Sequence, residues 1–293
     1  PWEHLRLSQM AVDHGSGDFR RYNIHQLLGA AALPFLLVAV WWSGTTSLTL
    51  QVALFVLAPA AAFSVRLFLR DIPLRGPAQP SPKTILREGV PFAWSVLAAD
   101  LLTKLAVLLI LWLASFTVQG YYAASVPAAF LLVVAPNAIA LYAFNAGARR
   151  QGAMPRKQLA LLAAGTVAFQ AIAAVCAMLA LPWLMLLVYG SEFQGAVPFA
   201  LALAPAYAAS GVSIVADGFL RGCGQARPGV LARAAGGVVL LLTVAMFFSR
   251  WREMAVPYGA VAANATAAIG LLIAAIRAAR RGPATPATAG GVA

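Results

Sequence analysis

Charged residues are scarce in this sequence. They make up 10% of its 293 positions, and only 9 residues are acidic. Soluble domains carry roughly 25% charged and 45–50% apolar residues, whereas 61% of this chain is hydrophobic and its mean hydropathy is +0.81. A chain this apolar does not have enough polar groups to cover its surface, so lipid must be its solvent. The composition therefore excludes a soluble enzyme.

Cysteine and histidine are also rare. Cys176 and Cys223 lie far apart, and the histidines at positions 4, 14 and 25 are scattered, so we expect no disulfide, no metal site and no cofactor. No nucleophile–base set, carboxylate pair or Walker phosphate loop is present, and we assign no catalytic residue. The net charge of +12 does not indicate nucleic acid, because the basic residues fall in short loops between apolar runs.

Long apolar runs fill most of the chain. A bilayer core about 30 Å thick is crossed by about 20 helical residues, and this length predicts an all-α membrane protein with about eight transmembrane helices. The predicted spans are 24–43, 48–69, 88–115, 120–147, 158–188, 196–219, 229–249 and 256–276.

The loops predict how these helices are grouped. Proline removes a backbone donor and blocks helix continuation, and a stretch with four prolines separates two helices from the following six. The predicted segments are a cytoplasmic amphipathic stretch at 1–22, two helices of a partial first bundle at 23–70, a Pro-rich cytoplasmic linker at 71–86, a six-helix bundle at 87–282 and a disordered tail at 283–293.

The basic residues predict the orientation. If successive spans cross the membrane in alternating directions, every Lys and Arg except Lys104, Arg250 and Arg252 falls on one side of the membrane. Arg233 is among the residues on that side. Cytoplasmic loops carry an excess of Lys and Arg. We therefore expect a multi-pass protein of the bacterial inner membrane, with both ends of this chain in the cytoplasm.

Asp100 and Lys104 are the main candidates for function. They lie four residues apart in the span 88–115, and therefore on one helix face. Ionisable groups at bilayer depth are costly and usually face a cavity or a partner. Two hypotheses follow: the pair lines a polar cavity where Lys104 attracts an anionic substrate, or the two charges neutralise each other and only pack.

Other polar residues in the spans are secondary candidates. Asn137 and Gln170 are predicted either to line the substrate cavity or to hydrogen-bond between helices. Asp217 and Arg221, again four residues apart near a span end, are predicted to form a structural ion pair. Gly218 and Gly222 have the small-xxx-small spacing of close helix contacts.

The order of these features resembles a known superfamily. "LREGVPF" followed by "GYY", "APNAIALYAFNAGARR", "VYGSEFQGAVPF", "LRGCGQARPG" and "VPYGAVAANATAAIG" resemble, in sequence order, stretches of the second six-helix bundle of the multidrug/oligosaccharidyl-lipid/polysaccharide exporter superfamily. The closest resemblance is to bacterial flippases of the O-antigen and capsule type. "SGDFRRYNIHQLLGAA" resembles the element between the fourth and fifth helices of that family, so about four N-terminal helices are expected to be missing.

This resemblance implies two six-helix bundles around a cavity that opens alternately to each side. The implied activity is transport, without covalent chemistry, of a polyprenyl-pyrophosphate-linked oligosaccharide for lipopolysaccharide or capsule synthesis. The implied partners are that lipid-linked substrate, membrane lipid and other membrane proteins of glycan assembly. Alternatives are a cation-coupled multidrug exporter, a lipid II flippase, a membrane-embedded glycan polymerase or ligase, and a structural scaffold.

Overall fold

The structure, a computed structural model, describes residues 82–149, residues 155–281 and scattered positions between residues 35 and 57. The chain divides into two compact units, Pro1–Gln79 and Pro80–Ala293. In the first unit, described positions on both sides of Gly44 are helical, and Gly44 lies in a turn with φ of 71°. Glycine adopts this left-handed conformation without steric cost. The remainder of the predicted segments 1–22 and 23–70, and the tail 283–293, lie outside the described residues.

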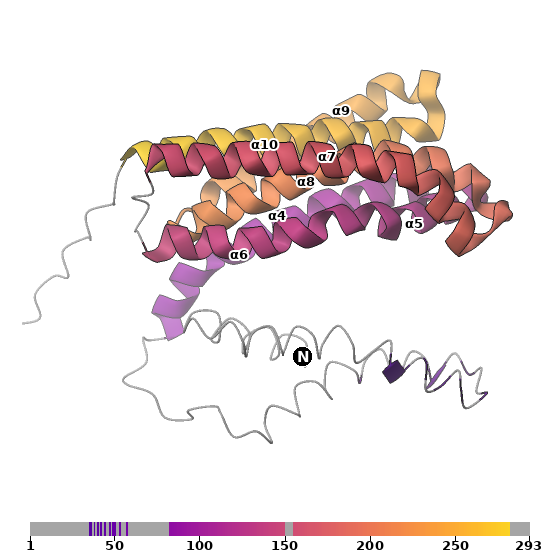
Figure 1. Cartoon of the computed structure of the whole chain (residues 1–293), viewed down its shortest axis with the longest axis horizontal. Helices are drawn as coiled ribbons and strands as arrows, with labels where there is room; N and C mark the ends of the chain where they lie inside the picture. The colour runs from indigo at the N-terminus through magenta and orange to yellow at the C-terminus, as the bar shows by residue number, and fades with distance from the viewer. Residues whose placement is uncertain are drawn as a thin grey trace, which may run out of the picture. The chain divides into compact units, whose positions relative to one another are not determined.

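The second unit is built from helices that run along one long axis (Figure 1). Short 3-10 turns join or interrupt them where the chain bends. In chain order the elements are α4 (Pro82–Leu113), α5 (Phe116–Phe130), η1 (Leu131–Val133), α6 (Val134–Arg149), α7 (Arg156–Tyr189), η2 (Ser191–Ala196), α8 (Val197–Gly222), α9 (Arg227–Trp251), η3 (Arg252–Met254) and α10 (Ala255–Arg281).

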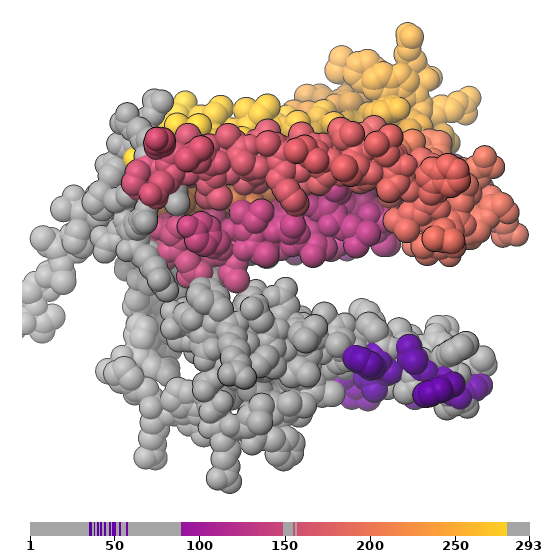
Figure 2. Space-filling model, in the orientation of Figure 1, coloured from indigo at the N-terminus to yellow at the C-terminus, as the bar shows by residue number. Residues whose placement is uncertain are grey.

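Helix α8 is the centre of this unit. It packs against α5, α6, α7 and α10, while α4 packs against α9. Figure 2 shows α7 and the α5–α6 segment covering α8 on the face toward the viewer. The residues of α8 alternate little between buried and exposed, because neighbours surround it on several sides. A helix that is apolar all round is expected in such a position.

Helices α6 and α8 approach closely through glycine. A Cβ on Gly218 would lie 2.6 Å from the carbonyl oxygen of Ala140, and one on Gly222 would overlap the backbone of Phe144. Gly147 of α6 makes the reciprocal approach to the backbone of Phe219. The glycine spacing noted in the sequence therefore marks a helix–helix contact, and α6 is the partner.

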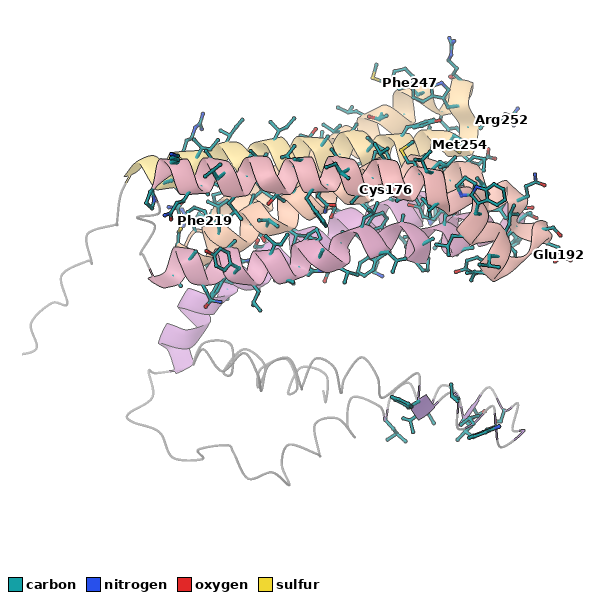
Figure 3. All side chains as sticks on the ribbon, viewed as in Figure 1. Cys176, Glu192, Phe219, Phe247, Arg252 and Met254 are labelled. Carbon is teal, nitrogen blue, oxygen red and sulfur yellow. The ribbon has the colours of Figure 1, made fainter. Side chains whose placement is uncertain are left out.

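The outer surface of the second unit is apolar. Large hydrophobic side chains are exposed along the helices, including Leu179, Leu187 and Leu231. Among the described residues, five continuous helical stretches are long and apolar enough to cross a membrane, and the last of these, Arg227–Ala279, contains both α9 and α10. Arg252, Met254 and Glu192 lie at one end of the unit, and Phe219 lies toward the other end (Figure 3). The chain is an all-α membrane protein.

Two differences between the predicted and the observed helices involve proline. Helix α4 begins at Pro82, inside the predicted linker 71–86, because proline is tolerated in the first helical turn, where its missing N–H would have no partner anyway. The predicted span 120–147 is interrupted by η1. Pro136 follows that break, and it has no N–H to donate to the carbonyl of Leu132, four residues earlier.

Candidate functional site

The described part of the second unit contains a polar recess between five helices. Its volume is about 30 Å³, which is room for about one water molecule. Most lining residues are apolar, but hydroxyl and amide groups from four different helices also reach it. The lining residues are Leu102, Thr103 and Ala106 of α4, Tyr122 of α5, Leu203, Ala206, Tyr207 and Ser210 of α8, Leu240 of α9, and Ala260, Ala263 and Asn264 of α10.

Several of these polar groups have no hydrogen-bond partner among the residues that the structure describes. Thr103 Oγ1 donates to the Ala99 carbonyl at 3.2 Å and Asn264 Nδ2 to the Ala260 carbonyl at 2.9 Å. No hydrogen bond within the described residues involves the hydroxyls of Tyr122, Tyr207 or Ser210. A polar group in an apolar span is costly without a partner, so these hydroxyls are placed to bond water or a bound molecule.

Packing between rings holds the two tyrosines in the recess wall. The ring of Tyr122 meets Phe199 edge to face with centroids 6.3 Å apart, and the ring of Tyr207 meets Phe130 in the same way at 6.0 Å. Edge-to-face pairs at these separations are favourable. The rings are therefore fixed by apolar contacts, and their hydroxyls are left for polar ones.

Asp100 and Lys104 lie outside this recess. Both side chains are exposed in the described structure. The buried stripe of α4 includes Leu102 and Ala106, and a residue two positions away lies about 200° around a helix from it. The pair therefore projects from the opposite side of α4, next to Thr103 at the recess edge.

No ion pair joins Asp100 to Lys104 in the part of the chain that the structure describes. Whether the pair lines a polar cavity or only packs stays a prediction. Because a lone ammonium group in acyl chains is costly, we expect this side of α4 to face water or polar groups in the membrane.

Asn137 and Gln170 do not join this site. Asn137 of α6 is exposed, whereas Gln170 of α7 is 1% exposed and its Nε2 donates to the Leu132 carbonyl at 3.1 Å. That carbonyl is the one that Pro136 leaves without an intrahelical partner. Gln170 therefore makes an interhelical hydrogen bond, the second of the two predicted roles, to a carbonyl at the break in η1. It does not line the recess.

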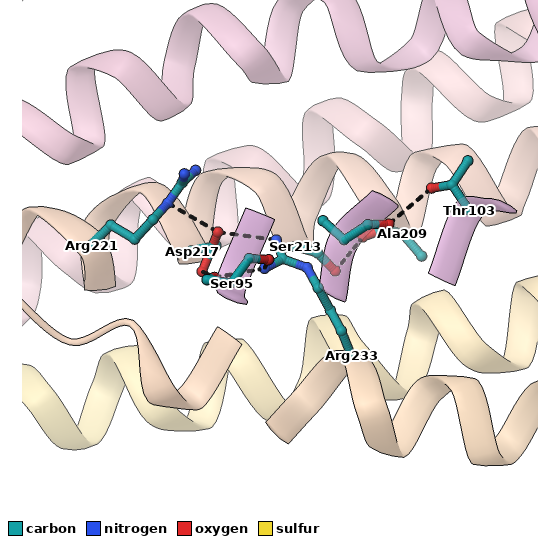
Figure 4. A network of polar contacts seen from close by, with 8 residues as sticks. Ser95, Thr103, Ala209, Ser213, Asp217, Arg221 and Arg233 are labelled. Carbon is teal, nitrogen blue, oxygen red and sulfur yellow. Dashed lines mark hydrogen bonds and ion pairs between the residues drawn. The ribbon is translucent and has the colours of Figure 1, made fainter. Parts of the chain in front are cut away.

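A buried ion cluster connects α4, α8 and α9 (Figure 4). Asp217 of α8 is 1% exposed, and its Oδ2 lies 3.0 Å from Arg233 Nη2 of α9 and 3.1 Å from Arg221 Nε. Ser95 of α4 donates from Oγ to Asp217 Oδ1 at 3.3 Å. Arg233 Nη1 donates to both the carbonyl and the hydroxyl of Ser95, each at 3.1 Å.

The two arginines of this cluster are not equivalent. Arg221 makes the predicted contact with Asp217, but its Nε lacks hydrogen-bond geometry and its side chain is 31% exposed. Arg233 is 6% exposed and forms the charge-assisted hydrogen bonds. The sequence analysis counted Arg233 only by its side of the membrane, although it falls within the predicted span 229–249. Helix α9 begins at Arg227 and buries Arg233 against α8 and α4.

Gly229 of α9 makes room for the cluster. A Cβ at this position would lie 2.5 Å from Asp217 Oδ1 and would overlap the hydroxyl of Ser95. The backbone of α9 therefore passes directly beside the carboxylate. The first turn of α9 is fixed by packing on the ion cluster as well as by its own hydrogen bonds.

Sequence reasoning missed most of the recess. Tyr122, Tyr207 and Ser210 were not singled out, although Tyr207 and Ser210 are three residues apart and so share a face of α8. Asn264 lies in the stretch "VPYGAVAANATAAIG", which was noted for its resemblance and not as part of a site. The spacing on α8 was a usable signal, whereas the approach of α4 and α5 to that face depends on tertiary packing.

Comparison with known proteins identifies the fold. No protein-family model and no curated protein matches the chain. A crystal structure of a MATE mutant matches with a TM-score of 0.75 and 15% identity, covering 96% of this chain and 67% of that one. A MATE in the straight conformation matches with a TM-score of 0.74 and 17% identity, covering 93% and 66%.

A MATE in complex with MaD3S gives a TM-score of 0.74 and 16% identity, with 93% of this chain and 65% of that one covered. The chain thus spans about two thirds of the length of these structures. MATE (multidrug and toxic compound extrusion) transporters are members of the exporter superfamily that the sequence resembles. The chain has the fold of these transporters over the part that it covers.

Proposed function

We propose that this chain is part of a flippase that moves a polyprenyl-pyrophosphate-linked oligosaccharide across the bacterial inner membrane for surface polysaccharide synthesis. The observation that carries the proposal is the polar recess, in which the hydroxyls of Tyr122, Tyr207 and Ser210 have no partner within the described residues. The fold supports a membrane exporter, and the character of the recess favours the substrate class.

The recess is too small for a sugar ring, but its polar groups suit a sugar hydroxyl at its edge in two ways. Sugar hydroxyls both donate and accept hydrogen bonds, as do the hydroxyls of tyrosine and serine. Tyrosine also offers an apolar ring beside its polar tip, which matches the mixed surface of a sugar ring. An apolar drug would not satisfy three unpartnered hydroxyls, so a wall of this composition favours an oligosaccharide.

Lys104 supplies the positive charge that an anionic pyrophosphate requires. It is the one basic residue that the sequence places at bilayer depth, and Thr103, its neighbour in α4, lines the recess. Asp100 lies one helical turn away, without an ion pair to Lys104 among the described residues. We propose that Lys104, on the other side of α4 from the recess, attracts the pyrophosphate, while polar groups at the recess edge contact sugar units.

The test uses the full-length gene in a strain that lacks it. Strains carrying Lys104→Ala, or Tyr207→Phe together with Ser210→Ala, are compared with wild type for surface glycan and for lipid-linked oligosaccharide left in the inner leaflet. A hydrogen bond to a charged group contributes about 1.5–3 kcal/mol and a neutral one about 0.5–1.5 kcal/mol. We therefore expect export to fall roughly tenfold or more in both strains.

Matched controls separate site effects from folding effects. Arg250→Ala removes an exposed basic residue at the other end of α9, and Thr243→Val removes a hydroxyl that bonds only within its own helix, at 2.8 Å. Both should export normally. If all four strains insert the protein equally and export glycan at the wild-type rate, the recess and Lys104 are not the substrate site.

A cation-coupled multidrug exporter is the second candidate, and the MATE structures favour it directly. The same strains discriminate the two functions. Loss of the gene with normal surface glycan and new sensitivity to cationic drugs would assign the recess to drug export. In that case Asp100→Asn should abolish resistance, because a cation-coupled exporter needs a carboxylate at depth.

A further inference from the structure

A groove runs between α9 and α10 near the turn that joins α8 to α9. The two helices meet at Gly270 and Ala232, where a Cβ on the glycine would lie 3.2 Å from the alanine methyl. Near this contact they border a groove of about 410 Å³ that is open to the surface. Ala274, Ala278 and Ile273 line it, and small residues at the first two positions keep it hollow.

Two polar side chains lie at one end of this groove. Arg277 of α10 and Gln225, in the turn before α9, line it together with Pro228. Arg277 is exposed, and within the described residues its guanidinium group has no ion pair and no hydrogen bond. The groove therefore combines an apolar channel for a chain with an unpaired cation and an amide at its end.

We propose that this groove binds an anionic phospholipid of the surrounding bilayer, with an acyl chain along Ala274 and Ile273 and the headgroup phosphate at Arg277. Basic pockets between transmembrane helices recognise anionic headgroups, and guanidinium binds phosphate in a fork of two hydrogen bonds. Charge complementarity selects the occupant, because a zwitterionic lipid offers the same acyl chain but no net negative charge. This site lies apart from the recess and does not depend on the proposed transport function.

A cross-link placed in the groove tests the proposal locally. The full-length protein carries the photoreactive residue p-benzoylphenylalanine in place of Ile273, which is 44% exposed and lines the groove. It is reconstituted in nanodiscs with equimolar phosphatidylglycerol and phosphatidylcholine, irradiated and analysed by mass spectrometry. We expect phosphatidylglycerol to be the main adduct.

Two variants and a control assign the selectivity. Arg277→Gln should lower the ratio of phosphatidylglycerol to phosphatidylcholine adducts about fivefold, which corresponds to the roughly 1 kcal/mol that one basic residue contributes at an anionic surface. Arg250→Gln, which removes an exposed arginine at the other end of α9, should leave the ratio unchanged. Ala274→Leu should fill the groove and reduce adducts of both lipids.

Three results would overturn the proposal. The first is an adduct ratio that equals the bilayer composition in the wild-type sequence. The second is the same ratio in Arg277→Gln and Arg250→Gln, measured on variants with unchanged melting temperature. The third is a polyprenyl phosphate as the main adduct when the experiment is repeated in native membrane extracts, which would assign the groove to the transport substrate.

Discussion

Replacing Asp217 by asparagine should destabilise the protein strongly, and more than removing either of its arginines. The wild-type cluster holds one carboxylate and two guanidinium groups, so it carries one net positive charge. Asp217→Asn keeps the shape of the side chain and removes the only negative charge among the described members of the cluster. Arg233, which is 6% exposed, then remains buried without a counter-charge.

The size of the effect follows from burial. Removing one partner of a buried ion pair costs about 3–5 kcal/mol, because an uncompensated charge is left inside. Arg233→Met should cost less, about 1.5–3 kcal/mol, the range for hydrogen bonds to charged groups. In that variant Asp217 keeps Arg221 at 3.1 Å and the Ser95 hydroxyl at 3.3 Å.

A double variant tests the electrostatic explanation. Asp217→Asn combined with Arg233→Met leaves only Arg221, whose side chain is 31% exposed and is able to extend toward water. The double variant should therefore be more stable than Asp217→Asn alone. Coupling energies of residues in contact reach about 0.5–3 kcal/mol, and we expect a value in the upper half of this range.

The assay is reversible unfolding of purified protein by sodium dodecyl sulfate, followed by circular dichroism at constant total detergent. The free energy of unfolding is compared among wild type, the two single variants and the double variant. The reasoning is refuted if Asp217→Asn lies within about 1 kcal/mol of wild type. It is also refuted if the free energy of unfolding of the double variant falls by the sum of the two single-variant decreases, since additivity would mean that the charges do not interact.

Three further predictions concern the backbone and one thiol. Gly222→Ala should cost about 1–3 kcal/mol of stability in the same assay by overpacking, whereas Gly165→Ala, where a Cβ meets nothing within 4 Å, should not destabilise. Arg252→Gly should raise stability by about 1 kcal/mol, because Arg252 has φ of 47°, in the left-handed region that favours glycine. Burial raises the pKa of the Cys223 thiol to about 11. Because only the thiolate reacts with maleimide, labelling of Cys223 in a Cys176→Ser background should be slow at pH 8. The labelling rate should then rise roughly tenfold per pH unit up to that pKa.

The sequence predicted the helices of the second unit well because each is long and apolar. Composition and run length determine that a segment prefers lipid, and the observed α7, Arg156–Tyr189, extends only slightly beyond the predicted 158–188. The predicted helix boundaries were wrong where a proline acts locally. Pro82 starts a helix inside the predicted linker, and the break at η1 precedes Pro136 within a single predicted span.

Partners across helices were less predictable than helices. The pair Asp217–Arg221 was found because both residues are on one helix, four positions apart. Arg233, which makes the shorter and better oriented contact, is on the next helix, and Ser95 is separated from Asp217 by 122 positions. Periodicity gives no information about such contacts, and for this reason the sequence analysis did not pair Arg233 with Asp217.

The same contacts suggest how the second unit would move. The ion cluster fixes α4 and α9 to α8 near one end, the glycine contacts hold α6 against α8, and Gln170 of α7 bonds to the break at η1. The first two links join α4, α9 and α6 to α8, the third joins α7 to η1, and breaking the buried ion cluster is costly. A transport cycle that deformed this unit near α8 would have to break these links repeatedly. We therefore expect the helices α4 to α10 to move largely as one body, and Asp217→Asn to loosen the unit without changing the recess.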